Sequence, residues 1–161
     1  MYGVKNEIIY QGTFAGGKQL KGTGINYYDD NALCYVGELL NGKYEGAGIL
    51  YHKDGSVMKE GIFLDGVFDT GIGITYYLDG SVCYEGSFVN GCYEGNGILY
   101  DEDGSVLLDG IFSKNEFVAG TGTIYDENRK YKYEGDIQNG KKNGLGILFK
   151  GIVWKGYTRA G

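Results

Sequence analysis

The chain of 161 residues contains no proline, one histidine, one tryptophan and three cysteines. Because proline is absent, every residue after the first can donate a backbone hydrogen bond, and a continuous β-sheet is permitted. The single histidine, His52, stands beside an Asp-Gly turn and is interpreted as a solvated loop residue. One histidine and three separated cysteines do not make a zinc site of four ligands. We therefore expect no catalytic residue, no metal site and no cofactor.

Basic residues and long apolar runs are also scarce. Fifteen Lys and Arg residues stand against 21 Asp and Glu residues, which gives a formal net charge of −6. A nucleic-acid partner is not expected, since no basic stripe is present to neutralise phosphates. No segment approaches the roughly 20 apolar residues of a membrane span, and the N-terminal residues lack the apolar segment of an export signal.

The three cysteines, Cys34, Cys83 and Cys92, give no plausible disulfide. Cys34 and Cys83 are separated by 83 − 34 = 49 residues, or two hairpins. At the usual strand spacing this is about 19 Å, well beyond the roughly 7 Å that a disulfide can bridge. Unpaired cysteines favour a reducing compartment, so we expect a cytoplasmic protein. The cysteines are interpreted as small apolar fillers, with a reactive Cys92 as the alternative.

Glycine and tyrosine are abundant instead, at 31 and 16 residues, and they recur in a fixed pattern. The pattern is a Tyr-x-Gly-x-Phe strand, a glycine-bounded tip, a Gly-x-Gly-Ile-x-Tyr strand and an Asp-Gly turn, and it occurs six times in recognisable form and a seventh time in part. The glycine of the Tyr-x-Gly-x-Phe motif is called here the anchor glycine of its repeat. The anchor glycines are Gly12, Gly37, Gly61, Gly86, Gly110, Gly135 and Gly156. Their spacing alternates between 25 and 24 residues as far as Gly135, so the full unit is a pair of repeats, 49 residues long. A fixed period of this size is typical of a repeat array.

Two turn signals in each repeat predict two antiparallel strands. In the first strand, offsets −4, −2, 0 and +2 from the anchor glycine share one face of the sheet and are mostly apolar. The second strand carries a similar row of Ile and Tyr residues. We expect both rows to be buried, with Phe88 and Tyr100 as central members. The anchor glycines are expected to leave room for an aromatic ring from the next strand.

These motifs resemble the MORN repeat, in its bacterial-type variant. The resemblance implies an all-β fold: an elongated, twisted, single-layer antiparallel meander of tandem hairpins with about 13 strands and an aromatic-lined groove. One array is expected over residues 1–161. Its repeats are predicted at 8–32, 33–56, 57–81, 82–105, 106–130 and 131–151, with a partial repeat at 152–161.

The hairpin tips depart from the basic loops of that family. Four of them carry an aromatic residue beside an acidic one, and only Lys141-Lys142 is basic. The tip aromatics are Tyr44, Phe68, Tyr93 and Phe117. Each could fold over its own hairpin, or together they could form a protein-binding ridge. The alternative binding surface is the predicted groove, with Tyr51, Tyr76, Tyr100 and Tyr125.

The favoured function is a non-enzymatic scaffold for protein–protein interaction, with a basic protein as partner. One version, suggested by similar bacterial repeats, is an immunity or antitoxin protein. Recruitment to a membrane or phospholipid surface is the alternative, but a net charge of −6 opposes binding to anionic lipid. A third possibility is an accessory module of a separately encoded enzyme. The sequence leaves the oligomeric state open.

Overall fold

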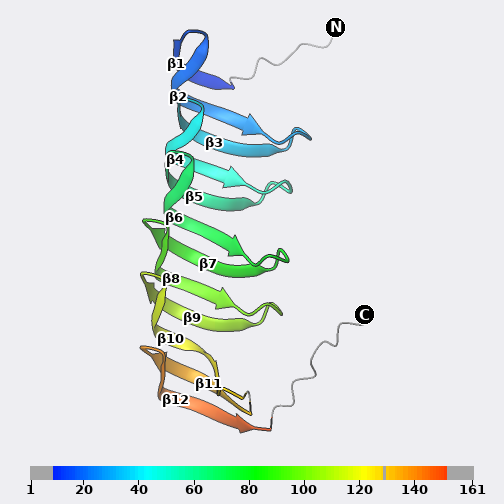
Figure 1. Ribbon diagram of the computed structural model, residues 1–161, viewed down its shortest axis with the longest axis vertical. Coiled ribbons are helices and arrows are strands. Elements are labelled where there is room, and N and C mark those ends of the chain that lie inside the picture. The colour runs from blue at the N-terminus through cyan, green and yellow to red at the C-terminus, as the bar shows by residue number, and fades with distance from the viewer. Residues whose placement is uncertain (1–8, 129, 152–161) are drawn as a thin grey trace. The chain divides into compact units, whose positions relative to one another are not determined.

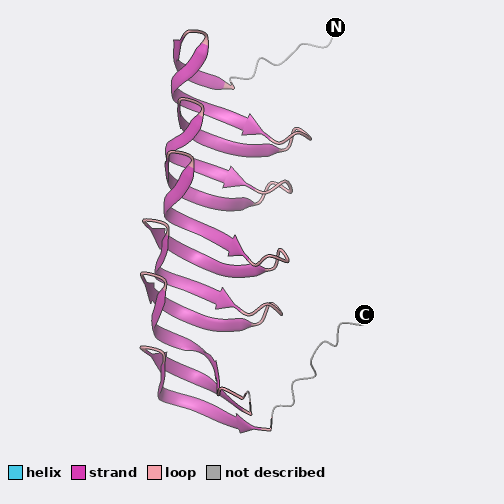
Figure 2. Cartoon of the chain, in the orientation of Figure 1, coloured by secondary structure: helices cyan, strands magenta, loops and turns pink. Residues whose placement is uncertain are grey.

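The computed structural model describes residues 9–128 and 130–151. The twelve strands of these residues belong to one antiparallel sheet and lie in it in sequence order (Figure 1). The described residues contain no helix (Figure 2), and so none that could cross a membrane. The predicted fold class, an antiparallel meander of tandem hairpins, is confirmed. The strands are β1 (Tyr10–Ala15), β2 (Lys18–Tyr27), β3 (Leu33–Leu40), β4 (Lys43–Tyr51), β5 (Val57–Leu64), β6 (Val67–Tyr76), β7 (Val82–Val89), β8 (Cys92–Tyr100), β9 (Val106–Ser113), β10 (Glu116–Tyr125), β11 (Tyr131–Gln138) and β12 (Lys141–Lys150).

The six full repeats each contain two of these strands. The predicted thirteenth strand and the partial repeat 152–161, with Trp154, lie outside the described residues. The chain divides into two compact units: unit 1 is Met1–Ile74 with Ser87–Cys92, and unit 2 is Thr75–Gly86 with Tyr93–Gly161. The single array over 1–161 stays a prediction.

The Asp-Gly turns are formed by a glycine with positive φ and by hydrogen bonds to the aspartate side chain. Gly55, Gly80 and Gly104 of the Asp-Gly turns have φ values of 87°, 88° and 81°, which only glycine adopts readily. In the first of these turns, Asp54 Oδ1 accepts hydrogen bonds from the Ser56 backbone N (2.9 Å) and hydroxyl (2.6 Å). These hydrogen bonds hold the pKa of Asp54 below its ordinary value. The turn carboxylates are therefore structural groups.

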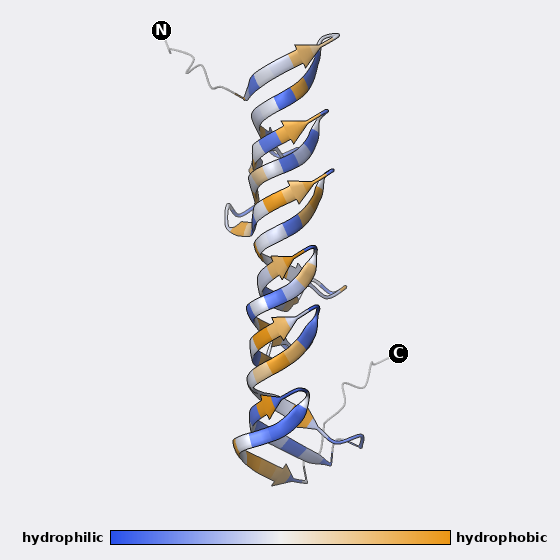
Figure 3. Ribbon diagram, turned by 90° about the vertical axis from the view of Figure 1, so that its left-hand side faces the viewer, coloured by the Kyte–Doolittle hydropathy of each residue, from blue (hydrophilic) through white to orange (hydrophobic). Residues whose placement is uncertain are grey.

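The buried residues form a core along one face of the sheet, called here the core face. They are Tyr35, Leu39, Phe63, Phe68, Tyr84, Phe88, Phe112, Tyr133 and Ile137. All except Phe68 stand at offsets −2 and +2 from an anchor glycine, so the predicted first row is confirmed at these positions. Phe14, the +2 residue of the first repeat, is exposed. Hydrophobic and hydrophilic segments follow one another along the strands in Figure 3, as a half-buried sheet requires.

The second predicted row lies on the opposite face, called here the outer face. In the β3–β4 hairpin, Tyr35 pairs with Leu50 and Gly37 pairs with Gly48, so Leu50 belongs to the core face. Ile49, the neighbour of Leu50, therefore points to the outer face. The same register holds between β8 and β9, where Leu99 pairs with Leu108. Tyr100 is only half-buried, and the prediction that it shares the buried row with Phe88 is wrong.

In β5 the −4 position also leaves the core face, because a β-bulge lies between it and the −2 position. Leu50 pairs with Lys59 but the next residue, Tyr51, pairs with Val57, so Met58 is the extra residue of a bulge. An extra residue reverses the face of everything beyond it. Val57 is consequently 46% exposed on the outer face, against the prediction of a buried position.

Two kinds of repeat alternate on the core face. In the even repeats a tyrosine at offset −2 lies over the glycine of the facing strand: a Cβ added to Gly48 would fall within 3.0 Å of the Tyr35 ring. The Tyr35 hydroxyl donates a hydrogen bond to Glu38 O (3.0 Å). This ring comes from the anchor glycine's own strand, which corrects the expectation of a ring from the next strand. In the third and fifth repeats, Lys59 and Leu108 replace the tyrosine.

Candidate interaction surfaces

The four tip aromatics pack on the core face of their own hairpins. Tyr44 stacks on Tyr35 at a centroid distance of 3.8 Å. Tyr93 stacks on Tyr84 in the same way (3.7 Å), whereas Phe68 meets Phe63 (5.3 Å) and Phe117 meets Phe112 (5.2 Å) edge-on. This is the first of the two arrangements considered for the tips, in which each ring covers its own hairpin. A partner-binding role for these rings stays a prediction.

The acidic residues beside the tip tyrosines hold the tip of the following hairpin. Glu45 Oε2 accepts a hydrogen bond from the Asp65 backbone N (2.9 Å). Glu94 Oε2 does the same for the Lys114 backbone N (3.0 Å), and its other oxygen accepts from the Ser113 hydroxyl (3.1 Å). These carboxylates satisfy backbone donors in tight turns, and this structural role accounts for their recurrence.

The predicted groove tyrosines stand at the ends of their strands, next to the turns that join successive hairpins. Strand pairing places Tyr51 opposite Val57, Tyr100 opposite Val106 and Tyr125 opposite Lys132. Tyr76 is 38% exposed and the other three are half-buried. The backbone carbonyl of Tyr51 accepts a hydrogen bond from the Tyr28 hydroxyl at 2.6 Å. Binding by this row also stays a prediction.

Two matching clusters join a cysteine to tyrosines. Cys34 Sγ lies 3.6 Å from the Tyr44 hydroxyl, and burial raises the pKa of Tyr44 to about 12. Burial also raises the pKa of Tyr77, beside Cys83 in the equivalent cluster, to about 12. Both cysteines are free and half-buried. A tyrosine that is neutral across the ordinary pH range serves as a packing group and hydrogen-bond donor.

Sequence reasoning missed an apolar surface on the outer face of unit 1. The outer apolar patch consists of Ala47, Ile49, Ile62, Leu64, Val67 and Ile72. Four of these are markedly exposed: Ile62 40%, Leu64 50%, Val67 69% and Ile72 65%. They are neighbours by strand pairing, since Leu64 faces Val67, Ile62 faces Ala47, and Ile49 and Ile72 both face Glu60. The sequence signal for this surface is the pair of apolar residues at odd-numbered offsets of β5, Ile62 at +1 and Leu64 at +3.

Glu60 is the one charged residue at the centre of the patch. It is exposed, and it pairs with Ile49 on one side and Ile72 on the other. A hollow of about 380 Å³ lies here, lined by Ala47, Gly48, Ile49, Glu60, Gly61 and Ile62. A partner surface that combines apolar side chains with one cation would match this arrangement.

The equivalent surface in unit 2 is mainly polar. Gly61 and Gly110 are separated by 110 − 61 = 49 residues, so each residue of the β5–β6 hairpin has a counterpart 49 residues later. The counterparts of Leu64, Val67 and Ile72 are Ser113, Glu116 and Thr121, whereas Ile49 and Ile62 correspond to isoleucines, Ile98 and Ile111. The same hairpin fold therefore forms with polar residues at these positions, so the fold does not need the apolar residues of unit 1.

Unit 2 has a different feature, a pocket of about 370 Å³. It is the place where the structure brings a tip aromatic, Phe117, near a predicted groove residue, Tyr125. The remaining lining is mostly apolar, with one carboxylate: Asp101, Leu107, Leu108, Thr123, Ile124, Ile137 and Gly140. The tip of the sixth repeat has Lys142 where the second and fourth have a tyrosine, and its ammonium lies 5.4 Å from the Tyr133 ring centroid.

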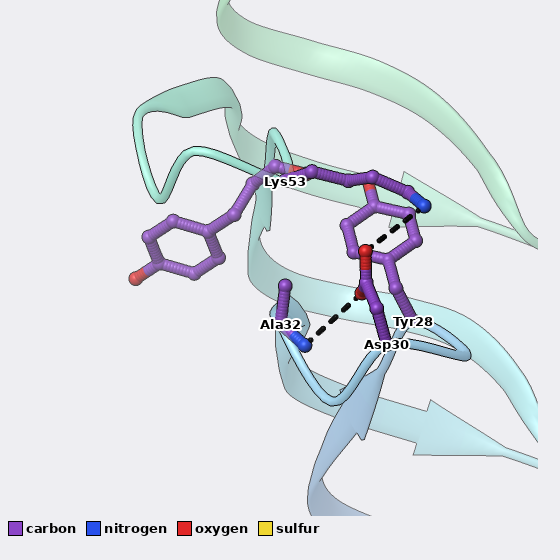
Figure 4. Close-up of polar contacts among 5 residues, drawn as sticks. Tyr28, Asp30, Ala32 and Lys53 are labelled. Carbon is purple, nitrogen blue, oxygen red and sulfur yellow. Dashed lines mark hydrogen bonds and ion pairs between the residues drawn. The ribbon is translucent and has the colours of Figure 1, made fainter.

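Turn charges also differ between the two units. In unit 1, Lys53 lies over the Tyr28 ring, 5.5 Å from its centroid, and pairs with Asp30 at 3.1 Å (Figure 4). Asp30 also accepts a hydrogen bond from the Ala32 backbone N. The hydrogen bond from Lys53 is the main reason that the pKa of Asp30 lies below its ordinary value. Forty-nine residues later, Glu102 takes the place of Lys53.

Within residues 9–128 and 130–151, no three His, Cys, Asp or Glu side chains are grouped so that they could hold a metal ion.

Comparison with protein families gives a match to the MORN repeat at residues 35–57, 84–106 and 133–150. These are the second, fourth and sixth repeats, which contain the tyrosine-over-glycine contact. A comparison with curated proteins found no match.

Proposed function

Because the chain contains MORN repeats, we propose that it is a non-enzymatic scaffold that binds a partner protein through the outer apolar patch. The observation that carries the proposal is the exposure of Leu64, Val67 and Ile72 at positions where unit 2 has Ser113, Glu116 and Thr121. Contiguous apolar residues on a protein surface mark interaction sites more often than isolated ones do.

The folding of the hairpin does not explain this surface. Ser113, Glu116 and Thr121 occupy the same positions in the β9–β10 hairpin, where the strands pair in the same register. Exposed Leu, Val and Ile side chains contribute little to stability when they contact only water. Their presence in unit 1 is therefore better explained by binding.

The partner that fits best is a protein with apolar side chains around a Lys or Arg. The cation would pair with Glu60, which stands exposed between Ile49 and Ile72. The net charge of −6 adds a long-range attraction for basic proteins that weakens with salt. The finer role of an immunity or antitoxin protein rests on resemblance alone and would require the captured partner to be a toxin.

The test is a comparison of two baits in extracts of the native host. The triple variant Leu64→Ser, Val67→Glu, Ile72→Thr gives the β5–β6 hairpin the residues of β9–β10. We expect proteins retained by the wild type to be lost from this variant, with at least about a tenfold weaker affinity for the purified partner. The control variant Ser113→Ala, Glu116→Gln, Thr121→Ser alters the equivalent surface and should bind normally.

Retention of the partner by the folded patch variant would contradict the proposal. Vesicles provide a second comparison, because a scaffold for membranes is the alternative. Phosphatidylserine vesicles at physiological salt should not cosediment the wild type, since an acidic protein is repelled by anionic lipid. Cosedimentation that the patch variant abolishes would replace the protein partner with a membrane.

A further inference from the structure

The repeats themselves indicate what the unit 2 pocket accepts. In unit 1, the ring of Phe68 contacts Phe63 of its own hairpin and two further side chains, Lys59 and Phe88. Lys59 places its ammonium 5.2 Å from the Phe68 centroid, and the Phe88 ring packs edge-on at 5.5 Å. The Lys59 stem lies over Gly73, where an added Cβ would meet its Cγ at 3.1 Å. The fold thus accommodates a lysine side chain over this phenylalanine.

Both neighbours are replaced by shorter residues 49 positions later. Phe117 corresponds to Phe68, whereas Leu108 is at the position of Lys59 and Ile137 is at the position of Phe88. Leu108, Phe117 and Ile137 all line the pocket of about 370 Å³. The pocket therefore occupies the place that a cationic side chain and an aromatic ring fill in unit 1.

The side chains beside the pocket are more negative than their counterparts in unit 1, and this difference favours the binding of a cation from another molecule. His52 and Lys53 of unit 1 are replaced by Asp101 and Glu102. Asp101 lines the pocket, and one of its oxygens accepts a hydrogen bond from the Glu102 backbone N at 2.9 Å. A carboxylate has room for several donors, so Asp101 can accept a further hydrogen bond from a ligand.

The nearby lysine of this unit is engaged elsewhere. Lys132 forms an ion pair with Glu134 and is not among the residues that line the pocket. The pocket thus combines an apolar wall, an aromatic ring and a carboxylate, which is the combination that suits a long side chain ending in a cation.

We propose that this pocket binds a Lys or Arg side chain of a partner protein, with the cation over the Phe117 ring and against Asp101. Its alkyl stem packs on Leu108 and Ile137, where unit 1 supplies its own Lys59. The site is distinct in sequence from the outer apolar patch and does not depend on the function proposed for that patch.

Two capped pentapeptides provide the probe: acetyl-Gly-Gly-Lys-Gly-Gly-amide and the same peptide with norleucine, which keeps the stem and lacks the charge. Methyl NMR signals of Leu107, Leu108, Ile124 and Ile137 report on the pocket. The lysine peptide should shift these signals, and the norleucine peptide should bind about tenfold more weakly, as expected for a cation–π contact with a nearby carboxylate. Equal binding of the two peptides, or no shift with the lysine peptide, would overturn the proposal.

Two variants locate the site. Leu108→Lys installs the residue that the third repeat carries at this position and should block the peptide by filling the pocket with the chain's own side chain. Asp101→Asn should weaken lysine binding several-fold and leave the weak norleucine binding unchanged. A Leu108→Lys protein that is folded by circular dichroism and still binds would place the site elsewhere. The triple patch variant should bind the lysine peptide normally, so the two proposals can fail separately.

Discussion

Replacing Gly97 with alanine tests the tyrosine-over-glycine contact that distinguishes the even repeats. An alanine Cβ at this position would lie 2.5 Å from Tyr84 Cε2 and closer still to the Cζ and hydroxyl atoms. The Tyr84 ring cannot easily give way, because it stacks on Tyr93 at 3.7 Å and meets Phe112 at 5.1 Å. Overpacking costs about 1–3 kcal/mol, and displacing a buried aromatic ring altogether costs about 3–5 kcal/mol. We expect Gly97→Ala to lower the free energy of unfolding by about 2–4 kcal/mol.

Gly73→Ala is the matched control in the third repeat. Its added Cβ would meet Lys59 Cγ at 3.1 Å and Phe68 Cε1 at 3.4 Å, and a flexible lysine stem can move aside. Neither glycine has a positive φ, so backbone strain does not separate the two variants. Urea unfolding followed by far-UV circular dichroism and by tyrosine fluorescence measures both. Equal stability of the two variants, within about 0.5 kcal/mol, would refute the proposed difference between even and odd repeats.

Two further predictions concern the core. Phe88→Ala should cost about 3–5 kcal/mol in urea unfolding, because Phe88 is 4% exposed and packs against Phe68; a loss below about 1 kcal/mol would show that the core face is misassigned. Burial raises the pKa of Tyr35, Tyr44 and Tyr77 from 10.0 to about 12, so the folded state favours neutral tyrosine. The stability from these groups is complete below pH 10 and should be lost as the pH rises toward 12; an absorbance titration at 295 nm with the same midpoint in folded and urea-unfolded protein would contradict this.

The period and the pairing of strands could be predicted from the sequence because both depend on local signals. Asp-Gly turns and glycine-bounded tips mark the ends of most hairpins, and offsets −2 and +2 identify all the buried hydrophobic residues except Phe68. The prediction failed where one extra residue changes the face of a strand. Met58 is apolar, like its neighbour Val57, so nothing in composition reveals that Met58 is the residue of a bulge and that Val57 turns outward.

The candidate surfaces were less predictable than the fold. The sequence pattern of an aromatic residue at a hairpin tip is the same whether its ring projects into water or stacks on another ring. Tyr44 stacks on Tyr35, nine residues earlier. The pocket beside Phe117 arises from shortened side chains at Leu108 and Ile137, and only alignment of the chain with itself at a shift of 49 residues, together with the packing around Phe68, reveals it.

Site-specific photo-crosslinking at position 72 tests the central claim, that the outer apolar patch binds a partner protein. A photoreactive residue replaces Ile72 in one protein and Thr121, its counterpart in unit 2, in a second. In an extract of the native host, the first protein should form a covalent adduct with one partner, and the second should not form that adduct. An adduct from position 121 without one from position 72, or from neither position, would contradict the account.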